Sequence, residues 1–400
     1  MGLGKTFTGA EKLIQLRAKV NLIVCQKSKI DDWIDHFKEY YQDKCIDIWD
    51  LTKKSYYESF FITINELHLN HIINVGIINY DLVFRRPELK QLKDFTLLLD
   101  ESSLIQNETT KRSKFILGLK PKNIILLSGT PTGGKYERLW SQLYLLGWEI
   151  PKDLFYNQYI DYHWDDSNGF PLMIIDGYKN EERLKRKMRE YGCQFLKTEE
   201  VFDLPEQVHQ NIRISTSKEY KEFRKNSVVS ILEKELIGNT ALTKMLYERQ
   251  LCGVFNKDKL NAFRDLVQST NDRLVVFYNF WDEIGALSEI AVSLNRPIGE
   301  INGTAKYLEP YENEDDSITF VQYQAGAMGL NLQKANKIIY FTPPLSSELF
   351  EQSKKRIHRI GQDKTCFYYY LTCKNSIEEK IYATLAMRKD YTEALFKEGK

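Results

Sequence analysis

Met1-Gly2-Leu3-Gly4-Lys5-Thr6 opens the chain with glycines, a lysine and a threonine in the order that a phosphate-binding loop uses. In such a loop the glycines let main-chain N–H groups curl around phosphate oxygens, the lysine reaches the β- and γ-phosphates, and the hydroxyl residue ligates Mg²⁺. The stretch therefore predicts nucleotide binding by Gly2, Gly4, Lys5 and Thr6. Because a loop of this kind follows a buried strand, we expect the start of the chain to be truncated or misassigned within the motif.

Composition describes a folded chain of about two domains. Its 400 residues are 42% hydrophobic and include 24 Tyr and 21 Phe, which suffices for sizeable cores. Lys and Arg total 56 against 55 acids, so a nucleic-acid surface has to come from local clustering. The six cysteines form no C-x-x-C pair, which favours free thiols in a reducing compartment and disfavours a structural zinc. No apolar run approaches the ~20 residues that span a bilayer, and the start does not resemble a signal peptide, so we expect neither membrane association nor secretion.

Short β-branched runs alternate with longer helical stretches, which is typical of parallel sheets with crossover helices. Near-continuous apolar runs in the first half predict strands covered on both faces, at Asn21–Cys25, Val75–Ile78, Thr96–Leu99 and Asn123–Leu127. The helices expected between them are Thr6–Lys19 and Ile30–Tyr41.

The pattern changes between about residues 136 and 205. Aromatic residues gather around 155–164, where we interpret them as core, and a charged helix is expected at Glu181–Glu190. Its basic side chains predict a solvated face, with DNA phosphates as the alternative. We interpret the whole segment as a helical and aromatic insertion.

The second half repeats the alternation. Strands are expected at Leu274–Tyr278, Ile318–Tyr323, Lys337–Phe341 and Phe367–Leu371, and helices at Ser217–Ile237, Asp258–Gln268, Trp281–Leu294 and Glu348–Ile360. The predicted fold class is thus α/β, with one domain over residues 1–205 and a second over 206–400.

Asp100-Glu101 directly follow the apolar run Thr96–Leu99. The carboxyl end of a buried strand is where an open α/β sheet places its ligand chemistry, and two carboxylates there are costly unless a metal or protons neutralise them. We therefore predict that Asp100 holds Mg²⁺ and that Glu101 orients and deprotonates the attacking water. The alternative is a turn whose acids cap the next helix.

Ser128-Gly129-Thr130-Pro131-Thr132 follows the next predicted strand. Small hydroxyl residues and glycine at a strand end can respond to a neighbouring phosphate, although the same letters also make an ordinary turn. The position one strand after the acidic pair favours a coupling role for Ser128, Gly129 and Thr130.

The most distinctive run is Gln352-Ser353-Lys354-Lys355-Arg356-Ile357-His358-Arg359-Ile360-Gly361-Gln362. On a helix, Gln352, Arg356 and Arg359 would lie at i, i+4 and i+7 on one face. Two guanidinium groups on one face suit bidentate clamping of a γ-phosphate, as arginine fingers do. The alternative, a basic helix end that complements its dipole, does not account for the glutamine and the spacing.

The order of these segments resembles the Swi/Snf-type ATPases of helicase superfamily two. Seven segments resemble motifs of this family. In the first half, Met1–Thr6 corresponds to D-E-M-G-L-G-K-T from its methionine onward, 22–33 to L-I-V-C-P…W, 79–81 to S/N-Y-[DE], 100–103 to D-E-[AS]-H and 128–131 to T-G-T-P. In the second half, 324–332 corresponds to A-G-x-x-G-[IL]-N-L and 356–362 to R-x-H-R-I-G-Q. The resemblance covers nearly the whole chain, and the last two motifs are the most specific. One departure is Ser103, which stands where relatives have a histidine that couples the nucleotide site to the second lobe.

The resemblance implies two tandem RecA-like lobes with ATP and Mg²⁺ between them, and a motor that tracks double-stranded DNA without reading its sequence. It implies an ATP contact at Gly329 and DNA contacts at Asn79, Tyr80, Gly326 and Asn331. The compact form is similar to viral or bacterial members, which implies a bacterial or virus-infected cytoplasm, or a nucleus in a eukaryote. Two alternatives stay open: a nucleotide- or DNA-binding module that does not hydrolyse ATP, and an unrelated P-loop enzyme such as a kinase.

Overall fold

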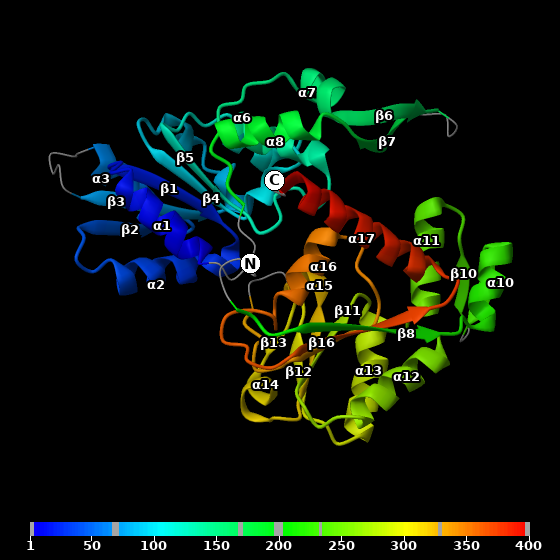
Figure 1. Cartoon of the computed structure of the whole chain (residues 1–400). Helices are drawn as coiled ribbons and strands as arrows, with labels where there is room; N and C mark the ends of the chain where they lie inside the picture. Colours follow the sequence, from blue (N-terminus) through cyan, green and yellow to red (C-terminus); the bar gives the residue numbers. More distant parts are fainter. Residues whose placement is uncertain are drawn as a thin grey trace. The chain divides into compact units, whose positions relative to one another are not determined.

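The computed structural model describes residues 4–65, 72–166, 171–195, 203–231, 234–326 and 330–396. The chain divides into two compact units, which we call the N-terminal unit (residues 3–196) and the C-terminal unit (residues 197–389). Each is built on a mostly parallel sheet with flanking helices, so the predicted fold class is confirmed (Figure 1). Among the described residues, no helix is both long and apolar enough to cross a membrane.

The N-terminal unit contains a five-stranded parallel sheet in the order β2-β3-β1-β4-β5. Its strands are β1 (Val20–Cys25), β2 (Ile46–Asp50), β3 (Ile73–Asn79), β4 (Thr96–Asp100) and β5 (Asn123–Leu127). The helices are α1 (Lys5–Gln15), α2 (Ile30–Tyr40), α3 (Lys54–Asn65), α4 (Tyr80–Val83) and α5 (Lys111–Leu117). Because all five strands run in one direction, β3, β4 and β5 end at the same edge of the sheet, and the polar segments that follow them lie along this edge.

Side chains alternate between the two faces of this sheet, and each face has its own core. Ile23 and Cys25 of β1 pack with α1 and α2 on one face, whereas Leu22 and Val24 pack with α3, α4 and α5 on the other. The prediction of strands covered on both faces is thus confirmed for β1. It holds only in part for the edge strand β5, whose side chains pack against both cores but are half-buried except for Leu127.

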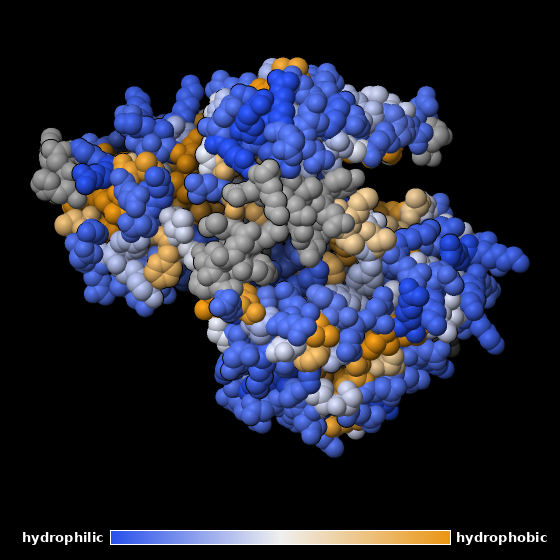
Figure 2. Space-filling model, in the orientation of Figure 1, coloured by the Kyte–Doolittle hydropathy of each residue, from blue (hydrophilic) through white to orange (hydrophobic). Residues whose placement is uncertain are grey.

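An insertion follows β5, as predicted. It contains α6 (Trp140–Leu145), α7 (Lys152–Tyr159), the hairpin β6 (Ile160–Asp165) and β7 (Leu172–Tyr178), and α8 (Glu181–Glu190). Phe155 and Tyr159 are fully buried in its core, which confirms the interpretation for these two residues, whereas Trp164 is 62% exposed and the interpretation is wrong for it. Helix α8 turns Leu184 and Met188 inward, and Figure 2 shows strongly hydrophilic side chains over it.

The C-terminal unit contains a seven-stranded sheet in the order β13-β12-β14-β11-β15-β16-β8, in which only β13 is antiparallel. Its strands are β8 (Gln207–Ile214), β11 (Leu274–Tyr278), β12 (Ile298–Ile301), β13 (Lys306–Tyr307), β14 (Ile318–Gln322), β15 (Lys337–Tyr340) and β16 (Cys366–Cys373). The helices are α10 (Lys218–Asn226), α11 (Ala241–Cys252), α12 (Lys257–Gln268), α13 (Trp281–Ser293), α14 (Glu309–Asn313), α15 (Tyr323–Gly326), α16 (Ser347–Lys354) and α17 (Ile377–Phe396).

The single helix predicted over Ser217–Ile237 is wrong. Helix α10 ends at Asn226, and Ser227 adopts a left-handed conformation with φ 59° that turns the chain into a hairpin of β9 (Val228–Ile231) and β10 (Lys234–Ile237). The hairpin buries Val229 and Leu236 against the aromatic face of α10, and burial of this kind outweighs helix propensity.

Candidate nucleotide site

Gly4 is the N-cap of α1 and has a left-handed backbone, with φ 65° and ψ 33°. This conformation favours glycine because a side chain would clash with the following carbonyl group. Helix α1 therefore begins at Lys5, and half-buried Thr6 lies in its first turn with the free main-chain N–H groups of a helix N-terminus. Gly2 lies outside the described residues.

The Lys5 ammonium group pairs with the carboxylate of Glu101, with Nζ 2.7 Å from Oε1. The chain thus brings its first helix to the end of β4, 96 residues away in sequence. Glu101 itself has a left-handed backbone, with φ 58°, an uncommon conformation for a non-glycine residue that typically clusters at functional sites. Its second oxygen, Oε2, is buried and has no hydrogen-bond partner among the described residues.

Asp100 is held by two aromatic residues that sequence reasoning had not assigned to it. The indole N–H of Trp33 donates to Asp100 Oδ2 at 3.1 Å, and the Tyr80 hydroxyl donates to the Asp100 carbonyl oxygen at 3.0 Å. Burial, and then the neighbouring Glu101 carboxylate, raise the pKa of the Asp100 carboxyl group. The acidic pair therefore carries negative charge that its surroundings only partly balance.

This donor set fits a hard divalent cation. Mg²⁺ prefers carboxylate, hydroxyl and water oxygens, and it is commonly bound through one or two carboxylates together with substrate phosphates. The raised pKa of Asp100, and the buried Glu101 Oε2 that has no partner in the described part of the chain, mark a place that favours a bound cation or a hydrogen-bond donor. Asp100 and the Thr6 hydroxyl are the residues that could hold the ion.

The Ser128–Thr130 loop is connected to the acidic pair through a residue that sequence reasoning missed. The buried amide of Gln142 accepts a hydrogen bond from Ser102 Oγ at 2.8 Å and donates one to the Pro131 carbonyl oxygen at 2.7 Å. Ser128 Oγ accepts from the Thr130 N–H at 3.2 Å, and Ser128, Gly129 and Thr130 are all half-buried. The coupling role predicted for this loop thus has a bonded route to Asp100-Glu101.

The helix predicted over Glu348–Ile360 is wrong at its end. Helix α16 stops at Lys354, whose carbonyl oxygen accepts from the Tyr368 hydroxyl at 3.0 Å. The Arg356 carbonyl oxygen accepts from the Leu332 N–H instead of continuing the helix. Gln352 and Arg356 therefore do not share one helix face with Arg359.

The three residues nevertheless lie within one short segment of the C-terminal unit. Gln352 and Arg356 are buried, and the guanidinium group of Arg356 donates to the Leu330 carbonyl oxygen at 3.4 Å. Arg359 is half-buried, and burial lowers the pKa of its guanidinium group. Arg356 is thus bonded to Leu330 and Leu332, the end of the glycine-containing stretch.

The residues predicted to contact DNA differ in their exposure. Asn331 is exposed, and Gly326 is the last residue of α15, whereas Gly329, predicted to contact ATP, lies outside the described residues. Asn79 and Tyr80 are buried, with 8% and 3% of their surface exposed. The Tyr80 side chain thus supports the acidic pair and offers little surface to DNA.

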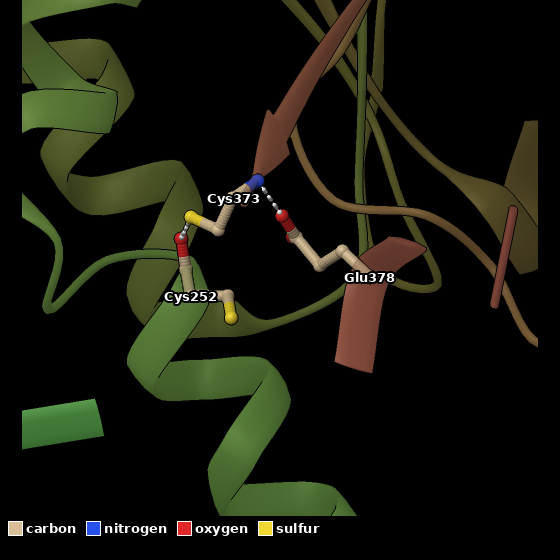
Figure 3. A group of neighbouring side chains, drawn as sticks. All are labelled: Cys252, Cys373 and Glu378. Carbon is tan, nitrogen blue, oxygen red and sulfur yellow. Dashed lines mark hydrogen bonds between the residues drawn. The ribbon is translucent and has the colours of Figure 1, made fainter. Parts of the chain in front are cut away.

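A second cluster of possible metal ligands lies in the C-terminal unit. The ligand atoms of Cys252, Cys373 and Glu378 lie within 4.8 Å of one another, and Figure 3 shows the two hydrogen bonds that link them. Glu378 is already paired with buried Lys259 at 2.5 Å, and Cys373 Sγ accepts from Asn256 Nδ2 at 3.3 Å. Since the Lys259 ammonium group already neutralises the Glu378 carboxylate, we interpret this cluster as structural and propose no metal there.

Comparison with known proteins gives the family. The sequence matches the SNF2-related domain over residues 1–261 and the helicase conserved C-terminal domain over residues 258–361. The chain belongs to the SNF2 family. The family predicted from the motifs is thereby confirmed, and it is one of ATP-hydrolysing enzymes.

Relatives of this SNF2 chain come from both eukaryotes and bacteria. The ISWI chromatin-remodeling complex ATPase ISW2 of Saccharomyces cerevisiae is 22% identical, across 100% of this chain and 39% of the relative. The putative ATP-dependent helicase/translocase YwqA of Bacillus subtilis is 21% identical, across 99% of this chain and 46% of the relative. This chain thus spans less than half the length of either protein.

A solved structure is also similar. The Sulfolobus solfataricus SWI2/SNF2 ATPase core in complex with dsDNA matches 98% of this SNF2 chain and 86% of its own, with 19% identity and a TM-score of 0.42.

Proposed function

We propose that this SNF2 chain is a DNA-stimulated ATPase that moves along double-stranded DNA, with ATP hydrolysed between two RecA-like lobes at residues 1–205 and 206–400. The observation that carries the proposal is the Lys5–Glu101 ion pair beside Asp100, because it combines a phosphate-binding lysine, a metal-binding carboxylate and a catalytic base at one strand end. The finding that the chain is an SNF2 member supports it.

In this proposal Lys5 has two successive partners. Before ATP binds, its ammonium group balances the charge of Glu101. The phosphates of ATP then compete for Lys5, and the main-chain N–H groups at the start of α1 bind them as well. When Lys5 leaves, Glu101 is free to orient and deprotonate the attacking water, and its orphaned Oε2 is the acceptor for that proton.

Mg²⁺ would be held by Asp100 and Thr6, where it neutralises charge that develops on the phosphate oxygens. The residues assigned to the second lobe would complete the site. Arg356 and Arg359 stabilise the transferring phosphoryl group as arginine fingers, and Gln352 and Gly329 contact the nucleotide. Catalysis therefore depends on closure of the two lobes, which links each ATP turnover to a movement.

DNA would contact the main chain and small side chains at the Ser128–Thr132 loop, at Gly326 and at exposed Asn331. Contacts of this kind reach phosphates and give salt-dependent affinity without sequence readout. A loop that touches DNA can report to the acidic pair, because Gln142 joins Pro131 to Ser102. We infer that the motor acts wherever the cell keeps its DNA, in a bacterial or virus-infected cytoplasm or in a nucleus.

The test is ATP hydrolysis with and without duplex DNA, for the wild type, Glu101→Gln and a control, Glu58→Gln, which changes an exposed glutamate of α3. We expect DNA to raise turnover in the wild type and in the control. Loss of the base should lower kcat by about 10²–10⁴-fold in Glu101→Gln. If the wild type binds ATP and DNA without turnover, the chain is a non-hydrolysing binding module and not a motor. If Glu101→Gln turns over ATP as fast as the wild type, Glu101 is not the base.

A further inference from the structure

Trp33 is connected to the acidic pair by the one polar atom of its side chain. The residue lies on α2 with 1% of its surface exposed, and its ring packs in the core formed with α1 and β1. A phenylalanine ring would also be apolar and aromatic there, so the distinctive part of tryptophan is the indole N–H, which donates to Asp100 Oδ2 at 3.1 Å. This bond fixes one carboxylate oxygen from a helix 67 residues away in sequence.

Fixing Oδ2 also fixes the other oxygen of Asp100. The terminal torsion of an aspartate is broad and roughly two-fold, so an unrestrained carboxylate can rotate away from the direction that a ligand requires. Hydrogen bonds to the free side of a metal-binding carboxylate hold it in place, and loss of such a partner commonly costs about 10–100-fold in metal affinity. The Trp33 bond holds the plane of the Asp100 carboxylate and leaves the second oxygen for a ligand.

Tyr80 acts on the main chain of the same pair. Its hydroxyl group is 3.0 Å from the Asp100 carbonyl oxygen and 3.4 Å from that of Glu101. Glu101 has the left-handed backbone described above, and such a conformation persists only where the surroundings hold it. The Tyr80 hydroxyl thus contacts the carbonyl groups of both peptide bonds that flank the Glu101 Cα, so it helps to set the direction in which the Glu101 side chain leaves the backbone.

The two aromatic residues approach from opposite faces of the sheet. Trp33 belongs to the core shared with α1 and α2, and Tyr80 belongs to the core shared with α3 and α5. We propose that Trp33 and Tyr80 are positioning residues that clamp the acidic pair, Trp33 through the Asp100 carboxylate and Tyr80 through the Asp100–Glu101 main chain. The inference rests on the proposed function only for the roles of Asp100 as metal ligand and Glu101 as base.

The test uses substitutions that remove one donor and keep an aromatic ring, Trp33→Phe and Tyr80→Phe. The same unit offers matched controls for both. Trp49 donates its indole N–H to Asn74 Oδ1, also at 3.1 Å, and the Tyr57 hydroxyl donates to Glu88 Oε2 at 2.8 Å. Trp49→Phe and Tyr57→Phe therefore each remove the same donor group from a residue whose hydrogen bond does not reach the acidic pair.

The first readout is binding of Mn²⁺ in the presence of ADP, followed by the electron paramagnetic resonance signal of free Mn²⁺. We expect Trp33→Phe to bind the ion about tenfold more weakly than Trp49→Phe, and Tyr80→Phe to match Tyr57→Phe. Equal Mn²⁺ affinity in Trp33→Phe and Trp49→Phe would overturn the role of Trp33, and so would a wild type that binds no Mn²⁺ with ADP.

The second readout is amide hydrogen exchange of the peptide that carries residues 100–105. We expect faster exchange in Tyr80→Phe than in Tyr57→Phe, together with a roughly tenfold lower kcat at an unchanged KM for ATP. Exchange and kcat equal to those of Tyr57→Phe would overturn the role of Tyr80. If the wild type hydrolyses no ATP, the proposed function fails, while Mn²⁺ affinity and exchange still decide the clamp.

Discussion

Removal of the Lys5 charge should destabilise the N-terminal unit through the acidic pair. Lys5→Met leaves the adjacent carboxylates of Asp100 and Glu101 without the ammonium group that lies 2.7 Å from Glu101 Oε1. A hydrogen bond to a charged group contributes about 1.5–3 kcal/mol to stability. The Lys5 and Glu101 side chains are 24% and 20% exposed, so solvent screening reduces the expected cost to about 1–2 kcal/mol. The double variant Lys5→Met/Glu101→Gln removes both charges and should recover most of that loss.

The stability that Lys5→Met loses should depend on pH in a defined direction. Burial and Glu101 raise the pKa of Asp100 above its unfolded value, and the Lys5 charge opposes this rise. A carboxyl group with a raised pKa binds its proton more tightly in the folded state, so its contribution to stability falls as pH rises from the unfolded towards the folded pKa. Loss of Lys5 raises the folded pKa further. The cost of Lys5→Met should therefore be small below about pH 4 and complete at neutral pH.

The assay is urea unfolding without nucleotide or metal at pH 4 and pH 7.5, followed by hydrogen exchange of β4 amides. This readout follows the N-terminal unit separately, which matters because a chain of two units need not unfold in one step. A cost below about 0.5 kcal/mol at pH 7.5, or an equal cost at the two pH values, would refute the reasoning.

Two further predictions concern the cores. In Gly9→Ala the new Cβ would lie 2.7 Å from Leu127 Cδ1 and 3.1 Å from Leu98 Cδ1, so we expect the N-terminal unit to lose about 1–3 kcal/mol in urea unfolding. The control Gly285→Ala meets no atom within 4 Å and should gain up to about 1 kcal/mol; equal effects would contradict the close packing of α1. Burial raises the pKa of Glu283 to about 7, so the C-terminal unit should lose about 3 kcal/mol between about pH 4.5 and 7. Glu283→Gln should reduce this dependence of stability on pH. Parallel profiles of stability against pH for the variant and the wild type would contradict the raised pKa of Glu283.

Central strands could be predicted from the sequence because they are apolar on both faces. The run at Leu274–Tyr278 is fully buried and coincides with β11. β2 and β8 were missed, because Ile46–Asp50 is short and is interrupted by two aspartates, and Gln207–Ile214 is mostly polar, so neither forms a continuous apolar run. The hairpin at 228–237 was missed as well, because α10 ends at a left-handed residue, Ser227, and no local pattern indicates that the helix stops there.

The candidate site likewise contains residues that the sequence could indicate and residues that it could not. The acidic pair, the glycine–lysine–threonine loop and the arginine segment are each contiguous in sequence, so residue order alone was enough to propose a chemistry for each of them. Trp33 and Gln142 reach their partners across 67 and 40 residues. Trp33 was expected in a helix and at the end of a family motif, and Gln142 within the insertion, but neither was expected to contact the site. Their hydrogen bonds depend on how those helices pack, which a local pattern does not contain.

Triplex displacement tests the central claim most directly. A third strand is annealed to one end of a linear duplex, and its release is followed after the protein, Mg²⁺ and ATP are added. We predict ATP-dependent release by the wild type and by Glu58→Gln, and none by Glu101→Gln. Release that does not require ATP, equal release by Glu101→Gln, or no release by a wild type that hydrolyses ATP would contradict a motor that moves along duplex DNA.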